Sequence, residues 1–216
     1  MRIRNKLAWR WRRLMDALGL AKGTAGGVFE DLCRRYSEIH RAYHNLSHLE
    51  VLFSLLEGYA IPERSAVELA GWFHDAVYDP ARTDNEKRSA ELAQTQLNAL
   101  GLEEALGERV GGLILATQTH QAPDEAAAWL LDADLAVLGF PPGAYAAYAR
   151  AIRLEYAWMP EERYQEGRAR ILMGFLERPY IYHTAPFRQR FEARARQNLR
   201  KEVLDLRKSG VREAAP

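Results

Sequence analysis

The chain is poor in cysteine and has no long apolar run. Its single cysteine, Cys33, cannot form an internal disulfide, and one thiolate cannot build a closed structural zinc site. The sequence shows no secretory signal pattern, so we expect a reducing, cytoplasmic environment. No apolar stretch reaches the length of a membrane span, and we therefore expect no membrane partner.

Strand signals and internal repeats are missing as well. The sequence lacks the alternating β-branched runs that mark strands, and no segment recurs with a period of about 20 to 50 residues. What is present is ordinary globular composition, with 48% hydrophobic and 27% charged residues. The glycine-rich stretch at 23–27 is short enough to be a loop. We therefore predict an all-α protein, a single-domain helical bundle over residues 1–216.

Capping signals and helical periodicity divide the chain into successive helices. Ser47 and Glu50 have the spacing of a capping box, and Thr83 and Glu86 repeat that spacing. A first helix is expected from the apolar positions that begin at Ile3 and recur at helical spacing. The later helices are expected at about 47–58, 62–78, 83–100, 108–120, 124–138, 143–157, 161–177 and 186–208.

Charge is spread unevenly along a chain whose formal net charge is only +1. Residues 1–22 carry seven basic side chains and one acidic one, and residues 186–216 carry nine and four. The middle of the chain is therefore acidic, as a cation site would require. The basic ends fit a phosphorylated ligand or plain solvated helix faces equally well. No recognised nucleic-acid motif is present, so a nucleic-acid partner is the least favoured.

Histidines and aspartates that could bind a metal ion stand out in the acidic middle. His74 is followed at once by Asp75, close to the helix stop at Asp79-Pro80, and His48 lies in the first turn of its own predicted helix. Near helix ends such side chains can converge on one ion, whereas neighbours in mid-helix diverge by about 100°. Asp132 and Asp134 lie in an otherwise apolar stretch, where two carboxylates are costly to bury without a positive partner. On the His-Asp pair alone, a metal ligand and a buried histidine bonded to its neighbour both stay open.

The mixture of imidazole and carboxylate ligands indicates the kind of ion. Such ligands suit Mn, Fe, Co or Ni, with Mg also allowed, in a site that keeps open positions. A phosphate oxygen and a water can occupy those positions, and the ion then polarises phosphorus and lowers the pKa of the attacking water. The expected cofactor is therefore a divalent metal ion.

The arrangement resembles the HD superfamily of metal-dependent phosphohydrolases. The matching pieces are Ser47-His48-Leu49-Glu50, Trp72-Phe73-His74-Asp75-Ala76 and Asp132-Ala133-Asp134-Leu135, in the family's order. The segments 43–48 and 152–156 are similar to an uncharacterised bacterial branch of predicted phosphohydrolases. The resemblance implies a metal-site core at about 44–140, with flanking helices at 1–40 and 143–208.

The resemblance also implies roles for single residues. His48, His74, Asp75 and Asp134 would hold the metal, and Asp134 is preferred over Asp132 as the ligand. Asp132 would then be an outer-shell residue or a helix-surface residue. The implied reaction is hydrolysis of a phosphomonoester or phosphodiester, with a small phosphate ester or nucleotide as substrate.

The acid/base group departs from the family pattern. Some nucleotidase members carry a glutamate three residues after the His-Asp aspartate, where this chain has Tyr78. Asp79 is a candidate substitute for catalysis, and so is Glu86, although each also fits a helix-end role. His44 is expected in the loop before its helix, from where it could reach a phosphate, support a ligand or cap a backbone group.

Two further side chains are candidates for substrate binding. Arg153 can clamp a phosphate through two parallel hydrogen bonds, with a surface salt bridge as the alternative. His120 is expected at a helix C-terminus, which favours histidine for its own reasons, although some superfamily members add a histidine to the site.

Three functions therefore follow from the sequence, in decreasing order of preference. The first is a metal-dependent phosphohydrolase, and the second is a catalytically silent module that binds a metal or a nucleotide. The third is a nucleic-acid-associated protein that uses the basic ends. The sequence leaves the substrate, the number of metal ions and the oligomeric state open, with a homodimer among the options.

Overall fold

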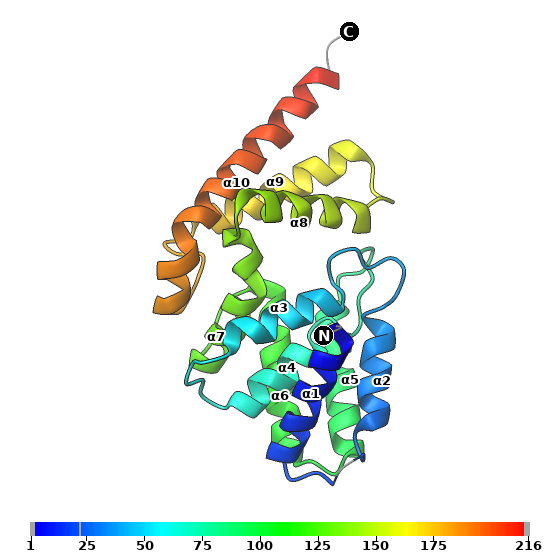
Figure 1. Cartoon of the computed structure of the whole chain (residues 1–216). Coiled ribbons are helices and arrows are strands. Elements are labelled where there is room, and N and C mark those ends of the chain that lie inside the picture. Colours follow the sequence, from blue (N-terminus) through cyan, green and yellow to red (C-terminus); the bar gives the residue numbers. More distant parts are fainter. Residues whose placement is uncertain (1–2, 22, 214–216) are drawn as a thin grey trace. The chain divides into compact units, whose positions relative to one another are not determined.

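A computed structural model shows an all-helical protein, and it describes residues 3–21 and 23–213 (Figure 1). Within these ranges there are ten α-helices, one 3-10 helix and no strand, which confirms the all-α prediction. The elements are α1 (Ile3–Ala17), α2 (Gly26–Arg35), α3 (Leu46–Leu56), α4 (Arg64–Phe73), α5 (Asn85–Ala99), α6 (Glu104–Thr119), α7 (Glu125–Leu135), η1 (Ala136–Gly139), α8 (Pro142–Glu155), α9 (Glu161–Glu177) and α10 (Ala185–Glu213).

Several helix ends differ from the sequence prediction because other groups satisfy the terminal backbone. Asn45, not Ser47, caps α3, since its side chain accepts the Ser47 N–H at 2.8 Å. Asp84 precedes α5 without capping it, because its carboxylate binds Arg82 instead. The helix expected to reach Tyr78 stops at Phe73, five residues early. The helix predicted at 161–177 has those bounds in the structure.

The chain divides into two compact units, Met1–Ala133 and Asp134–Pro216. This division does not decide whether the units are separate domains, so the single-domain prediction stays a prediction. No described helix combines the length and the hydropathy that crossing a membrane requires.

In the first unit, α4 is the central helix. It contacts α1, α3, α5 and α6, and every residue from Leu69 to Phe73 is buried. Trp72 anchors its C-terminal end among aromatic rings, with centroids 5.2 Å from Trp11, 6.0 Å from Phe29 and 4.8 Å from Phe53. Trp11 is itself fixed, because its indole N–H donates to the Ala25 carbonyl at 3.1 Å. The end of α4, where the His-Asp pair lies, is therefore rigidly held.

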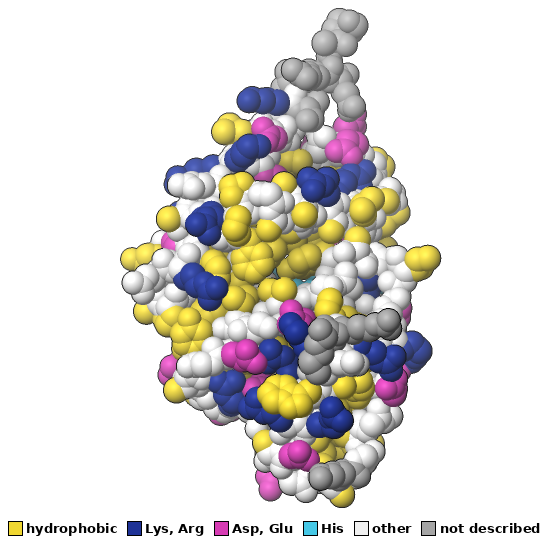
Figure 2. All heavy atoms as spheres, in the orientation of Figure 1, with side chains coloured by type: hydrophobic (Ala, Val, Ile, Leu, Met, Phe, Trp, Pro, Cys, Tyr) yellow, Lys and Arg dark blue, Asp and Glu magenta, His cyan; other side chains and the backbone are white. Residues whose placement is uncertain are grey.

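The basic face of α1 is offset by acidic residues of its neighbours. Figure 2 shows basic and acidic side chains interspersed over this part of the first unit. The ion pairs join Arg4 to Glu30, Lys6 to Glu50 at 2.7 Å and Arg10 to Glu57 at 2.8 Å. These partners belong to or border α2 and α3, so part of the α1 charge supports packing within the unit.

The second unit is built on η1, α8, α9 and α10. Phe191 packs against Tyr182 and Phe187, and α10 runs beside α9 and η1. The Asn198 amide donates to the carbonyls of Leu138 and Phe140 at 2.8 and 2.9 Å, which ties α10 to η1. Gly139 permits this contact, because a Cβ there would lie 2.5 Å from the Phe191 Cβ and 2.8 Å from its carbonyl oxygen.

We expect Gly139→Ala to destabilise the second unit by about 1–3 kcal/mol or more, since backbone atoms cannot move aside for the added methyl. Urea unfolding measures this change. Gly167→Ala is the matched control within α9, where a Cβ would meet nothing within 4 Å. That variant should gain about 0.5–1 kcal/mol of helix stability. Equal stability of the two variants would contradict the close packing of η1 on α10.

Candidate metal centre

His48 is held by a capped helix with a deeply buried apolar face. It is the third residue of α3, and Leu49 and Leu52 on the same helix are fully buried. The His48 side chain is only 2% exposed. Its Nδ1 lies 3.2 Å from the Tyr43 hydroxyl oxygen, which leaves Nε2 as the atom that faces inward.

His74 and Asp75 follow directly on the buried end of α4. His74 is the C-cap residue, and its Nδ1 lies 3.0 Å from the carbonyl oxygen of Gly71. Gly71 also lets α3 and α4 approach closely, because a Cβ there would lie 3.0 Å from the ring of Phe53. The predicted proximity of a helix end is confirmed, and it allows both side chains to reach one point.

The two imidazoles and the neighbouring carboxylate converge. The Nε2 atoms of His48 and His74 lie 3.2 Å apart. The Asp75 Oδ2 lies 3.0 Å from the His74 Nε2 and 3.9 Å from the His48 Nε2. Three segments that are distant in sequence thus supply the group, because α7 brings Asp134 to it.

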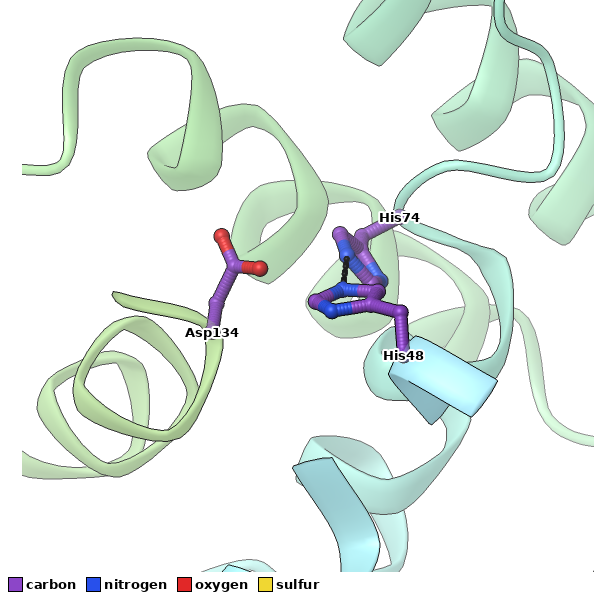
Figure 3. Close-up of side chains that lie close together, drawn as sticks. All are labelled: His48, His74 and Asp134. Carbon is purple, nitrogen blue, oxygen red and sulfur yellow. Dashed lines mark hydrogen bonds between the residues drawn. The ribbon is translucent and has the colours of Figure 1, made fainter. Parts of the chain in front are cut away.

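Asp134 completes a buried His-His-Asp group. Ligand atoms of His48, His74 and Asp134 all lie within 4.8 Å of one another, and Figure 3 shows the Asp134 carboxylate directed toward the two rings. Asp134 is the penultimate residue of α7. Asp132 is fully buried, so its interpretation as a helix-surface residue is wrong.

The chemistry of this donor set fits a cation. The Gly71 carbonyl can only accept, so the His74 Nδ1 carries the proton and the Nε2 of a neutral ring presents a lone pair. That lone pair faces the His48 Nε2 and the Asp75 carboxylate across about 3 Å. The His48 Nε2 can donate a hydrogen bond to this lone pair, or both nitrogens can present lone pairs to an ion beside the carboxylate. The group can therefore hold a metal ion, with nitrogen and oxygen ligands of the kind that divalent transition metals accept.

His44 lies beside this group, as expected from its place in the loop before α3. Its ring centroid is 5.9 Å from that of His48, 5.0 Å from that of Tyr43 and 4.4 Å from that of Tyr78. The side chain is half-buried. His44 is thus a neighbour of the candidate ligands that keeps contact with solvent.

Asp79 serves a turn between α4 and α5. The side chain is exposed, and its Oδ1 accepts the Ala81 N–H at 2.9 Å. The Asn85 amide bridges the same turn by binding both the N–H and the carbonyl of Asp79. The helix-end role expected for Asp79 is wrong, because α4 already ends at Phe73. Its catalytic role stays a prediction.

The two predicted substrate-binding residues have structural settings of their own. Arg153 lies in the second unit, where Nε binds Glu161 at 2.8 Å and the two Nη atoms donate to the carbonyls of Tyr156 and Met159. Its guanidinium also lies over the Tyr164 ring. His120 is the C-cap of α6 in the left-handed region, with φ 51°. Arg153 thus forms the salt bridge expected as its alternative role, and His120 ends its helix as expected. Substrate binding by either residue stays a prediction.

Sequence reasoning missed Arg41, which lies directly behind the group. Its side chain is fully buried and donates to backbone carbonyls on both ligand-bearing segments. Arg41 lies in a loop, so no periodicity marks it. Only its position shortly before a predicted ligand helix could have suggested a role.

The choice between two aspartates on α7 can be tested by metal affinity. The two side chains lie about 200° apart around the helix, so only one can face the group directly. We expect Asp134→Asn to raise the Kd for Mn²⁺ by more than about 100-fold, beyond the cost of losing an outer-shell partner. Asp132→Asn should raise the Kd less than Asp134→Asn does. It should lower the free energy of unfolding more, because Asp132 is a fully buried carboxylate. The reverse order of affinities, measured by calorimetry, would assign the ligand to Asp132.

Comparisons with known proteins give no family for this chain. No protein-family model matches it, and neither a curated protein nor a solved structure does. The proposed function therefore rests on the geometry of the His-His-Asp group.

Proposed function

We propose that this protein is a metal-dependent phosphohydrolase that acts on a small phosphate ester, with a nucleotide as the favoured class. The observation that supports it is the convergence of two buried imidazole Nε2 atoms with carboxylates that reach solvent. His48 and His74 are almost fully buried, whereas Asp75 and Asp134 are partly exposed. We propose that a substrate and a water reach the group from the side of these two carboxylates.

The proposed ligands are His48, His74, Asp75 and Asp134. A bound divalent ion would supply Lewis-acid activation of the phosphoryl group and of water. The protein residues fix the donor atoms in place: Gly71 holds the His74 tautomer, and the Tyr43 hydroxyl contacts the outer nitrogen of His48. The burial of His48 and His74 also excludes bulk water from their side of the group, which strengthens electrostatic interactions there.

His44 is the proposed residue for proton transfer. It stands next to a ligand histidine without being one of the four ligands, and its half-buried ring can meet both the group and solvent. A histidine in such a position can protonate a leaving oxygen or hold a phosphate oxygen. Contacts with Tyr43 and Tyr78 keep the ring in that position.

A catalytically silent metal- or nucleotide-binding module is the second candidate. It is favoured by Tyr78, which occupies the position of the expected glutamate and packs against His44. The turn role of Asp79 adds to it, because the carboxylate of this candidate acid/base residue already accepts the Ala81 N–H. This candidate predicts nucleotide affinity without turnover under any divalent metal.

Metal content and turnover separate the two candidates. Protein purified without chelator should contain divalent metal, and a panel of nucleotides and phosphoesters with Mn, Co and Mg should show release of phosphate or of a phosphomonoester. We expect His74→Ala to lose both the metal and the turnover, because it removes the most buried ligand. Unchanged turnover in that variant would reject the proposed enzyme, and metal binding without turnover in the wild type would support the silent module.

A matched pair of asparagine variants tests the proton-transfer residue. His44→Asn should lower kcat by about 10²- to 10⁴-fold with the metal retained, the usual cost of removing a general acid or base. Asp79→Asn should stay near wild-type kcat, because the amide oxygen can still accept the Ala81 N–H. A large loss of kcat in Asp79→Asn with normal metal content would instead assign the catalytic role to Asp79.

A further inference from the structure

We infer that Arg41 is the positioning residue of the metal centre, which sets where Asp75 lies relative to His48. This inference rests on the proposed metal site, and it assigns to the site a residue outside the ligand set. Arg41 acts through the backbone of both ligand-bearing segments.

The hydrogen bonds of Arg41 join the two segments directly. Its Nη1 donates to the carbonyl oxygen of His44 at 3.2 Å and to that of Asp75 at 2.6 Å. Its Nη2 donates to the Ala76 carbonyl at 3.2 Å. The first of these carbonyls lies four residues before His48, and the second belongs to a proposed ligand itself. One guanidinium thus fixes the loop that leads into α3 against the chain that leaves α4.

Aromatic rings hold the guanidinium in a single orientation. Its central carbon lies 5.2 Å from the ring centroid of Tyr36 and 5.3 Å from that of Tyr78. The Tyr36 hydroxyl also accepts the Asp75 N–H at 3.2 Å. Asp75 is therefore held at both its N–H and its carbonyl by neighbouring groups.

The physical need for an arginine comes from the helix end. Carbonyls in and beyond the last turn of α4 have no partner within the helix, and the negative end of the helix dipole favours a cation there. Arg41 is fully buried, and Glu38 balances its charge through Nε at 2.9 Å. A planar fork can reach three carbonyls at once from this position, whereas the compact ammonium of a lysine cannot.

The test is metal affinity of an Arg41→Lys variant, with Mn²⁺ as the probe and calorimetry as the measurement. We expect the Kd to rise by about 10- to 100-fold, the range observed for residues that orient metal ligands. Arg196→Lys is the matched control, because Arg196 likewise donates to carbonyls, those of Leu176, Arg178 and Pro179 in the second unit. The control should retain wild-type affinity for Mn²⁺. An equal loss in both variants would overturn the inference.

A double-mutant cycle distinguishes positioning from general stability. In an Asp75→Ala background, Arg41→Lys should cost little further affinity, because the ligand that Arg41 positions is already absent. Full additivity would overturn the inference. If Arg41→Lys does not fold, Arg41→Gln replaces it in the cycle, since the glutamine amide can still donate to one of the three carbonyls.

Failure of the proposed metal site and failure of the proposed role of Arg41 give different results. Absence of Mn²⁺ binding in the wild type, or binding unaffected by His74→Ala, rejects the metal centre itself. Binding that depends on His74 but is unchanged in Arg41→Lys rejects only the role of Arg41.

Discussion

The meeting of two buried imidazole nitrogens is the constraint on which the first unit depends. The Nε2 atoms of His48 and His74 lie 3.2 Å apart, with a carboxylate oxygen 3.0 Å from one of them. The two nitrogens can share one hydrogen bond, or both can present lone pairs to an ion. The surrounding helices fix this contact: α3 starts at a side-chain cap, α4 is anchored through Trp72, and Gly71 lets the two approach. The packing thus holds two imidazole nitrogens and a carboxylate close enough together that they could hold a metal ion.

The site divides into a well-defined part and an open part. Backbone and aromatic contacts hold the candidate metal ligands in place, such as the contact of the His74 Nδ1 with the Gly71 carbonyl. No carboxylate is proposed for proton transfer, because Asp79 holds a turn. The two proposed functions use the same candidate metal site and differ in whether His44 transfers a proton.

The spacing of apolar residues predicted the helices, because a helix that buries one face repeats its apolar residues about every 3.6 positions. The bounds of α9 agree with this prediction. Ligand types and helix ends indicated that His48, His74 and Asp75 could converge, whereas the choice of Asp134 came from the family resemblance. The helix caps were harder to predict. Asn45 and Ser47 are both suitable N-cap residues, and the backbone geometry of the folded chain determines which of them caps α3. Arg41 was not predictable, because its role depends on carbonyls brought together by tertiary folding. The partner of Arg153, Glu161, was likewise not predictable, because folding brings the two side chains together.

The central claim is that an ion belongs between His48 and His74, and anomalous X-ray diffraction from crystals grown with Mn²⁺ tests it most directly. The account predicts an anomalous peak about 2.0–2.3 Å from both Nε2 atoms, with oxygen ligands from Asp75 and Asp134. Well-diffracting crystals grown with Mn²⁺ that lack this peak would contradict it.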